Sequence, residues 1–388
     1  MSEGSASGVS ASSEVEVDFS RPYRSPDELV NLEAVLASDH AHGDGPFTKR
    51  ATDKLTAIMG APHALLTTSC THGLEMTALL LDLAPGDEVV LPSFTFPSAA
   101  TAVVSRGATP VFVDLDPATG NIDATQVAEA VTAQTRAVMV MHYGGVPVAL
   151  DEILSITDAA GIALVEDNAH GLGTPGLGTR GAFATQSFHD TKNVHCGEGG
   201  ALVINDARFL ERAEIIREKG TNRARFLRGQ VDKYTWVDAG SSYLLSEFGA
   251  AVLDAQLAAF DTIQQLRRSV WNAYAAGLSN WAGEHDIRLM SDRAGLEHAA
   301  HLYYLVMPDN AGQSALIEHL KQHGVRAAFQ YVPLDSSPAG RRYGRTVGGR
   351  ELSRSHDFST RLVRLPLWAG MSDSQVERVI AAVTSYGN

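Results

Sequence analysis

The chain has 388 residues, a length that suggests two or three domains at about 150 residues each. Lys and Arg together number 31 and Asp and Glu 45, so the formal net charge is −14, which argues against a general nucleic-acid-binding protein. Contents of 44% hydrophobic and 20% charged residues are typical of a globular chain with a core, and they exclude collagen, a coiled coil and wholesale disorder.

Residues 1–17 are small, polar and acidic, and we expect them to form a disordered tail. They lack the basic and apolar regions of a signal peptide, and no run of about 20 apolar residues occurs that could span a membrane. Cys70 and Cys196 are the two cysteines, so at most one disulfide could form. These features favour a reducing compartment, and we expect a cytoplasmic protein without membrane or nucleic-acid partners.

After the tail, short β-branched segments alternate with helical segments. The predicted strands are 87–93, 109–116, 135–143 and 161–167. The predicted helices between and around them are 74–83, 98–106, 123–132 and 150–160. Strands of this kind separated by helices indicate an α/β fold, with a mainly parallel sheet covered on both faces.

The pattern changes after residue 170. Two strands, 183–188 and 200–204, are joined by a polar loop and followed by a charged helix over 207–220. A long helix is predicted from 246 to about 278, and the segments 301–308, 313–324 and 325–332 then read as strand, helix and strand. We therefore divide the chain into a large domain, 18–262, and a smaller C-terminal α/β domain, 263–388.

Three predicted strand ends and helix starts carry polar residues that could form one site. Asp167 ends a buried strand, Lys192 follows the next strand, and Ser69, Cys70 and Thr71 precede a helix whose free N–H groups could hold an anion. Ligands of open α/β sheets bind at the carboxyl ends of the strands. Taken singly, the same residues also suit a salt bridge, a solvated lysine and an ordinary helix cap.

Two other patterns are weaker. The glycines of 171–176 match G-x-G-x-x-G, but no helical segment follows them, as a dinucleotide-binding fingerprint requires. His189, His195, Cys196 and Glu198 are close in sequence, but their spacing matches no standard zinc site. We therefore expect neither an NAD-dependent enzyme nor a bound metal.

A reactive lysine, a carboxylate for a ring nitrogen and a phosphate cradle together describe a site for pyridoxal 5′-phosphate (PLP). With these residues in place, the chain resembles the DegT/DnrJ/EryC1/StrS sugar aminotransferases from about Asp18 to the C-terminus. The motifs that carry the resemblance are GDGPFTKR, LLTTSCTHGLEM, GDEVVLPSFTFPS, VEDNAHG, SFHDTKN, GEGGALVIND and RLPLWAGMS. Within the family, residues 211–246 are similar to the TDP-4-amino-4,6-dideoxygalactose transaminase (WecE/RffA) branch.

The resemblance implies PLP-dependent transferase fold type I, with a mostly parallel seven-stranded sheet in the large domain, and a homodimer with active sites at the subunit interface. It matches Lys192 to the lysine that is linked to the cofactor and Asp167 to the partner of the pyridine nitrogen. The remaining matched positions are His170 at the ring hydroxyl, Phe96 stacked on the ring, and Cys70 (through its backbone), Thr71 and Ser187 at the phosphate.

The implied reaction transfers the amino group of L-glutamate to the C4 keto group of TDP-4-keto-6-deoxyglucose, while PLP cycles through pyridoxamine 5′-phosphate. Its products are a TDP-4-amino-4,6-dideoxyhexose and 2-oxoglutarate. We take Tyr331 as a candidate substrate-binding residue. We hypothesise that Arg223 and Arg228, in the segment 221–236, contact the nucleotide diphosphate of their own or of a neighbouring subunit.

The chain departs from the family pattern at two positions. Leu244 occupies the place where many relatives have an Asn that reaches the neighbouring subunit's phosphate site, and Asp335 replaces the His of YxPLH. Other keto nucleotide sugars, or a non-catalytic regulatory role, are the alternatives. A sugar dehydratase of the same fold would have histidine in place of Lys192. The sequence leaves the gluco or galacto configuration and the pathway open.

Overall fold

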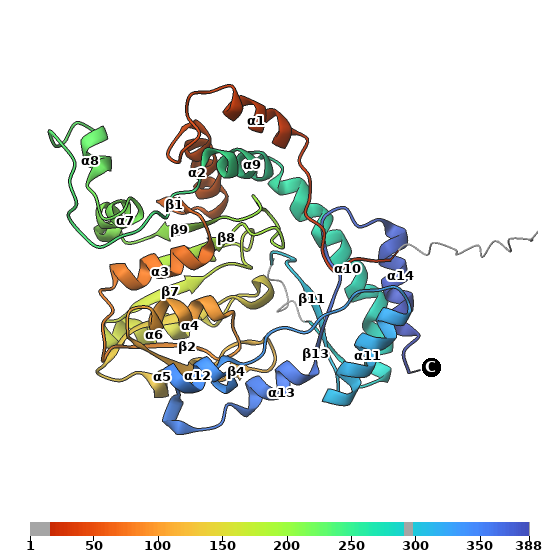
Figure 1. Ribbon diagram of the computed structural model, residues 1–388. Helices are drawn as coiled ribbons and strands as arrows, with labels where there is room; N and C mark the ends of the chain where they lie inside the picture. Colours follow the sequence, from red (N-terminus) through yellow and green to blue (C-terminus); the bar gives the residue numbers. More distant parts are fainter. Residues whose placement is uncertain (1–15, 291–297, 388) are drawn as a thin grey trace, which may run out of the picture.

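The structure, a computed structural model, describes residues 16–290 and 298–387. At its centre lies an eight-stranded sheet in the order β1-β9-β8-β7-β6-β2-β3-β12 (Figure 1). Seven of these strands are β1 (Ala64–Thr67), β2 (Glu88–Pro92), β3 (Thr109–Val113), β6 (Thr135–Met141), β7 (Ala163–Asp167), β8 (Phe183–Ser187) and β9 (Gly200–Ile204). The two-residue strand β12 (Arg345–Thr346) comes from the C-terminal part and adds an eighth strand beside β3.

The sheet is mostly parallel, as predicted. Only β9 runs against its neighbours, since it pairs antiparallel with both β8 and β1. The side chains of β9 alternate between two apolar clusters. Leu202 and Ile204 pack in the cluster that includes residues of α3 (Cys70–Leu80) and α7 (Leu210–Arg217). Ala201 and Val203 pack with residues of α2 (Pro46–Met59) and α9 (Glu247–Ala258), so helices cover both faces.

Further helices complete the large domain. Those between the strands lie close to their predicted positions: α4 (Pro97–Val104), α5 (Ala124–Ala130) and α6 (Leu150–Ala160). Two helices before the sheet, α1 (Asp27–Leu36) and α2, were not predicted, and a short hairpin of β4 (Leu115–Asp116) and β5 (Asn121–Ile122) follows β3.

The prediction of one long helix over 246–278 is wrong. The chain forms α9 and then α10 (Phe260–Glu284), with a break at Ala259, whose φ and ψ are −90° and 7°. Residues 246–278 contain no proline, and Gly249, near the start of this segment, lies within α9 rather than at the break. The sequence therefore carries no signal for the break. The break lets α9 pack against α1 and α2 while α10 continues to α14 (Asp373–Thr384).

The C-terminal part has an antiparallel sheet in the order β10 (Arg288–Leu289), β11 (Tyr303–Val306) and β13 (Leu362–Leu365). The predicted strand 325–332 does not form: Val325 and Ala328 make only isolated bridges, to Val17 and Arg364. The other helices here are α11 (Asn310–Gln322), α12 (Pro338–Tyr343) and α13 (Ser353–Arg361). The predicted boundary between the two domains, after residue 262, falls within α10, and this helix continues from one part into the other. The domain boundary therefore stays a prediction.

The predicted tail differs from the structure at its last residue. Val17 is fully buried, and its backbone pairs with Gly324 and Arg326, so the ordered chain begins before residue 18. Residues 1–15 of the predicted tail lie outside the described residues. Along the described chain, no helix has both the length and the apolar character of a membrane-spanning segment.

Residues 218–243 form a projecting segment between α7 and α9, which we call the arm (Figure 1, green). The arm contains the short helix α8 (Arg223–Leu227) and is closed by isolated bridges between Glu218 and Ser242 and between Thr221 and Trp236. It includes the segment 221–236, in which we hypothesise that Arg223 and Arg228 contact the nucleotide diphosphate.

Candidate active site

A cavity of about 380 Å³ lies at the carboxyl ends of the central parallel strands. The strand ends and helix starts that surround it come from segments more than 250 residues apart in the chain. The lining includes eight of the ten predicted site residues: Cys70, Thr71, Phe96, Asp167, His170, Ser187, Lys192 and Tyr331. The structure thus brings these residues to one place, while the role of each stays a prediction.

The N-terminus of α3 forms one wall of the cavity. Ser69 caps the helix, since its hydroxyl accepts a hydrogen bond from the His72 N–H (3.1 Å). Gly200 of β9 passes so close that a Cβ there would collide with the Cys70 nitrogen and the Ser69 carbonyl carbon. Helix N-termini favour anions because of their free N–H groups and the helix dipole. The wall therefore suits a phosphate.

Ser98 belongs to the same wall and was missed in the sequence. Its hydroxyl is hydrogen-bonded to that of Thr71 (2.7 Å), and both line the cavity. Ser98 lies in the first turn of α4, so a second helix start faces the cavity. The signal in the sequence was the FPS segment before a helical pattern, which we used only for Phe96.

Asp167, at the end of β7, is buried with 4% of its surface exposed. Its Oδ1 accepts from the Ala169 N–H (3.1 Å), and the Cys70 thiol also lies toward Oδ1 (3.9 Å). Burial raises the pKa of Asp167, although the Ala169 hydrogen bond and Lys192 act in the opposite direction. A cationic ring nitrogen beside this carboxylate would offset the cost of its burial.

Lys192 lies in the loop after β8, and its backbone N–H donates to the His189 carbonyl (2.9 Å). Burial lowers the pKa of Lys192 to about 8, against the opposing effects of Cys70 and Asp167. At pH 7 roughly a tenth of the amine is then unprotonated, far more than in a lysine with an unperturbed pKa. An unprotonated lysine amine can bond to an aldehyde and can take up a proton.

His170 is held by three neighbours. Its Nδ1 accepts from the Gly144 N–H (3.3 Å), and its Nε2 lies 3.4 Å from the Tyr331 hydroxyl. Its ring stacks on His301 at 4.1 Å between centroids. Burial lowers the pKa of both histidines well below their usual value, so both rings are neutral. Because Nδ1 of His170 accepts, its proton is on Nε2, which can donate to a ring oxygen.

His301 was not predicted. Its Nδ1 lies 2.9 Å from Oδ1 of Asn193, the residue that follows Lys192 in the sequence. Its ring stacks on the ring of His170. The residue belongs to the C-terminal part and precedes β11, where it looked like part of an apolar strand. No local signal in the sequence connects it to residues 167–193.

Phe96 ends the loop before α4 and is 52% exposed, although it is a large apolar residue. Its ring lies 6.1 Å from that of Tyr331, edge to face, and both residues line the cavity. An aromatic side chain that remains open at the mouth of a polar cavity is placed to stack on a flat ligand.

Arg223 and Arg228 do not reach the cavity of their own chain. Both lie in the arm, where Arg223 contacts Glu218 (3.4 Å) and Arg228 makes a paired contact with Glu214 (2.8 and 2.9 Å). The hypothesis that they bind the nucleotide diphosphate therefore requires a neighbouring subunit.

The two departures from the family pattern also lie outside the cavity. Leu244 makes an isolated bridge with Thr67, at the end of β1. Asp335 accepts from the Ser93 hydroxyl, and its other oxygen lies 3.1 Å from Nε2 of His356. Asp335 thus fastens the loop after Tyr331 to the end of β2.

The glycine-rich segment 171–178 leads into β8 without an intervening helix, so it lacks the geometry of a dinucleotide site. Buried Glu166 holds the end of this segment by accepting from the N–H groups of Gly178, Arg180 and Gly181. His195 is turned to the Tyr23 carbonyl (2.7 Å). Over residues 16–290 and 298–387, no three metal-ligating side chains gather.

These features fit PLP. The helix start suits its phosphate, the buried carboxylate of Asp167 suits its ring nitrogen, the Lys192 amine suits its aldehyde, and Phe96 offers an aromatic face. When bound, PLP supplies an electron sink for chemistry at an amino-acid Cα.

Comparisons with known proteins agree with this geometry. The model of the DegT/DnrJ/EryC1/StrS aminotransferase family matches residues 22–384. The aminotransferase TlmJ from Streptoalloteichus hindustanus is 32% identical, with a TM-score of 0.86 over 95% of this chain and 98% of that one. DesV from S. venezuelae is 29% identical, with a TM-score of 0.83 over 92% of this chain and 94% of that one.

The putative sugar aminotransferase Spr1654 from Streptococcus pneumoniae, solved in PLP and PMP forms, shares the fold. In its PMP form it is 24% identical, with a TM-score of 0.86 over 95% of this chain and 98% of that one. The fold of these neighbours is PLP-dependent transferase fold type I, as the sequence predicted. The chain therefore belongs to the DegT/DnrJ/EryC1/StrS family of PLP-dependent sugar aminotransferases.

Proposed function

We propose that this enzyme transfers the amino group of L-glutamate to the C4 keto group of TDP-4-keto-6-deoxyglucose. The products are 2-oxoglutarate and a TDP-4-amino-4,6-dideoxyhexose. The observation that carries the transfer is the shared cavity of Lys192, with its lowered pKa, and buried Asp167. The choice of acceptor is supported by the similarity of residues 211–246 to the WecE/RffA branch.

Each site residue has a defined task in this proposal. The unprotonated Lys192 Nζ takes the proton from the Cα of the donor and gives it up later in the half-reaction. Asp167 keeps the ring nitrogen protonated, and His170 donates from Nε2 to the ring hydroxyl oxygen. Cys70, Thr71 and Ser187 hold the phosphate, with Ser98 as an added contact.

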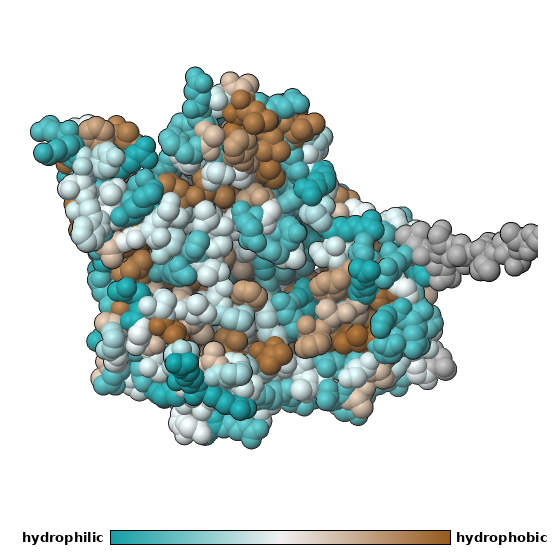
Figure 2. Space-filling view, viewed as in Figure 1, coloured by the Kyte–Doolittle hydropathy of each residue, from teal (hydrophilic) through white to brown (hydrophobic). Residues whose placement is uncertain are grey.

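We propose further that the enzyme is a homodimer. Figure 2 shows an apolar surface over α1 and α9, where Leu29, Val30 and Leu36 are more than 60% exposed. The arm exposes a second set of large apolar side chains: Phe226, Leu227, Tyr234, Trp236 and Val237. Surfaces of this kind are typical of subunit contacts. In the dimer, Arg223 and Arg228 would approach the partner's nucleotide-binding site.

We place the enzyme in the cytoplasm, where nucleotide sugars and glutamate would be its substrates. Cys70 and Cys196 are both free thiols, as a reducing compartment favours.

The test is incubation of the PLP-loaded enzyme with TDP-4-keto-6-deoxyglucose and L-glutamate, followed by NMR of the sugar product. We expect an amino group at C4, and the coupling constants give the gluco or galacto configuration. Parallel reactions with a C3-keto isomer and with UDP-linked sugars test the choice of acceptor. If the enzyme forms 2-oxoglutarate only with one of these other sugars, the proposed acceptor is wrong. If it forms no 2-oxoglutarate with any of the sugars, the proposed amino transfer is wrong.

A further inference from the structure

The side chain that follows Lys192 is held by the C-terminal part of the chain. Asn193 is buried, and its amide nitrogen donates to Oε1 of Gln264 (2.9 Å) and to the Ala299 carbonyl (2.7 Å). Its amide oxygen lies 2.9 Å from Nδ1 of His301. Gln264 belongs to α10, and Ala299 and His301 precede β11. The loop that carries Lys192 is therefore fastened from outside the large sheet, by residues to which the proposed function gives no task.

These hydrogen bonds determine where the proton of His301 lies. Because the amide nitrogen of Asn193 has two acceptors, the amide oxygen faces His301 and can only accept. Nδ1 of the neutral His301 ring therefore carries the proton and donates it. The face of the same ring stacks on the ring of His170. His301 thus connects the loop of Lys192 with His170.

The segment 299–301 has an unusual backbone conformation. Ala300 has a φ of 45°, in the left-handed region that residues with a Cβ rarely adopt, and it lies between the two residues that bind Asn193. Buried Arg267 of α10 donates from Nε to the Ala300 carbonyl (3.1 Å) and from Nη2 to the His301 carbonyl. Such a conformation persists only where the surrounding structure fixes it, and it occurs often at functional sites.

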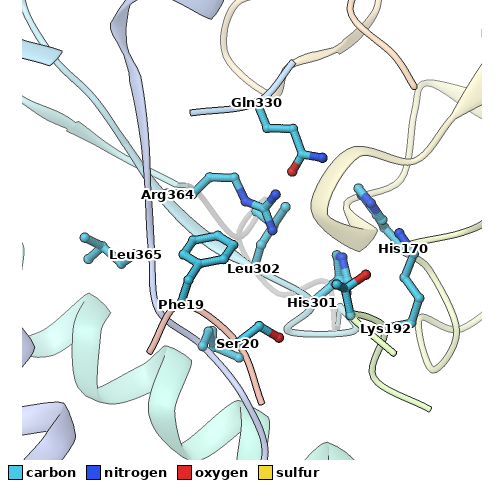
Figure 3. A pocket seen from close by; sticks show the side chains of 11 residues that line it. Phe19, Ser20, His170, Lys192, His301, Leu302, Gln330, Arg364 and Leu365 are labelled. Carbon is cyan, nitrogen blue, oxygen red and sulfur yellow. The ribbon is translucent and has the colours of Figure 1, made fainter. Parts of the chain in front are cut away.

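The residues of this network lie close together around Lys192. Figure 3 shows His170, Lys192 and His301 at a cavity of about 160 Å³, which all three line. On another side, the same three residues and Asn193 border a void of only about 10 Å³. Protein interiors packed as closely as this transmit a displacement from one side chain to the next. A shift of Asn193 or His301 is therefore expected to move Lys192 and His170.

We propose that Asn193 and His301 are positioning residues of the reaction. Their shared hydrogen bond places the loop of Lys192, and the stack of His301 supports His170. Lys192 and His170 serve adjacent groups of PLP, its aldehyde and its ring hydroxyl, so their relative position matters for the chemistry. A misplacement of about 1 Å can cost on the order of 100-fold in rate. This inference deepens the proposed function and rests on the tasks that it gives to Lys192 and His170.

Three variants separate the hydrogen bond from the stack. His301→Phe keeps an aromatic ring beside His170 but has no donor for Asn193. His301→Asn keeps a donor at the place of Nδ1 but has no ring. Asn193→Ala removes the acceptor of this bond together with the contacts to Gln264 and Ala299.

His319→Phe is the matched control. His319 lies on α11 in the C-terminal part and also stacks on a histidine, His323, at 4.1 Å between centroids. Its Nε2 contacts the Ala382 carbonyl (3.0 Å), and it lines neither the cavity of about 380 Å³ nor that of about 160 Å³. The control therefore makes the same kind of change away from the site.

The variants are compared by cofactor uptake and by the first half-reaction. Absorbance between pH 6 and 10.5 follows the uptake of PLP by the cofactor-free full-length protein, and equilibrium dialysis gives the Kd of PLP. The rate and KM of the first half-reaction are measured, without acceptor, as the loss of the cofactor's visible band on addition of L-glutamate. Thermal unfolding shows how much stability each variant loses.

We expect His301→Phe and Asn193→Ala to slow the first half-reaction by about 10- to 100-fold and to change the KM for L-glutamate by less than about threefold, because they move Lys192 rather than remove a substrate contact. In both, the pH midpoint of PLP uptake should rise from about 8 toward the ordinary value of a lysine, since a displaced amine is less buried. His301→Asn should keep the midpoint but raise the Kd of PLP by at least about threefold, because His170 loses its aromatic support. His319→Phe should behave as the wild type.

The double variant of Asn193→Ala and His301→Phe tests whether the two residues act through their shared hydrogen bond. If they do, it should react no more slowly than Asn193→Ala alone, because that bond is already lost. Two effects that multiply in full would overturn the inference. So would rates and midpoints in His301→Phe and Asn193→Ala that equal those of His319→Phe, even where stability falls. A wild type whose visible band does not respond to L-glutamate contradicts the proposed function instead, and the uptake of PLP still decides the inference.

Discussion

Burial acts on Asp167 and Lys192 in opposite directions. It raises the pKa of the carboxylate and lowers that of the amine to about 8, so in both cases it disfavours the charged form. The two residues also stabilise each other's charge, which limits both shifts. A pyridine ring with its nitrogen at Asp167 and its aldehyde at Lys192 uses both effects, because it brings a cation to the acid and reacts with the neutral amine.

The pKa of Lys192 predicts how the cofactor-free protein takes up PLP at different pH values. Only the unprotonated amine attacks an aldehyde, so the uptake rate should rise as the pH passes through about 8 and level off above it. An unperturbed lysine would place the midpoint near 10.4. Stopped-flow absorbance at the cofactor band between pH 6 and 10.5 measures this midpoint. A midpoint above 10 would show that burial does not act on Lys192 as described.

Lys192→Arg separates chemistry from cofactor binding. Arginine keeps a positive charge in the cavity, but it cannot act as an amine nucleophile or proton carrier, since its guanidinium stays protonated. We expect turnover to fall by at least about 10³-fold while PLP still binds through the phosphate wall and Asp167. Steady-state rates and equilibrium dialysis of PLP measure the two effects. Normal turnover by this variant would remove Lys192 from the mechanism.

At the scale of elements, the close approach of β9 to α3 shapes the phosphate wall. A methyl group at Gly200 would collide with backbone atoms of Ser69 and Cys70, which cannot move away without shifting the start of α3. We expect Gly200→Ala to lower the free energy of unfolding by about 1–3 kcal/mol and to weaken PLP binding. Urea unfolding and PLP titration measure these changes.

Gly283→Ala in α10 is the control for this prediction. A Cβ at Gly283 meets no atom within 4 Å, and alanine favours a helix over glycine by up to about 1 kcal/mol, so this variant should be unchanged or slightly more stable. If Gly200→Ala matched Gly283→Ala in stability and PLP affinity, the close contact would have no part in forming the wall.

The elements also show what the sequence could and could not predict. The parallel sheet and the positions of Asp167 and Lys192 followed from local patterns, because buried strands and their polar ends are short-range signals. The break at Ala259 had no local signal, since packing of α9 against α1 and α2 decides it. His301 could not be found because the C-terminal part reaches the site only through the tertiary fold.

At the scale of the whole molecule, the C-terminal part completes a site that the large sheet begins. The strand ends of the large domain supply Asp167 and Lys192, while the C-terminal part supplies His301 behind His170 and Tyr331 over the cavity. Residues of both parts line the cavity. The family match likewise extends over both parts, residues 22–384.

The arm provides the test of subunit assembly. Trp236 is 77% exposed and Leu227 66%, and we expect both to be buried by a second subunit. Replacing both by serine should weaken the dimer by about 2 kcal/mol or more, at least about 30-fold in Kd, because large central side chains dominate such interfaces. Sedimentation over a range of concentrations measures Kd. The control is Tyr343→Ser, which replaces an exposed aromatic residue of α12, far from the arm in Figure 1. A dimer that the arm variant leaves as tight as the control would place the interface elsewhere, and Arg223 and Arg228 would then have no route to a partner's site.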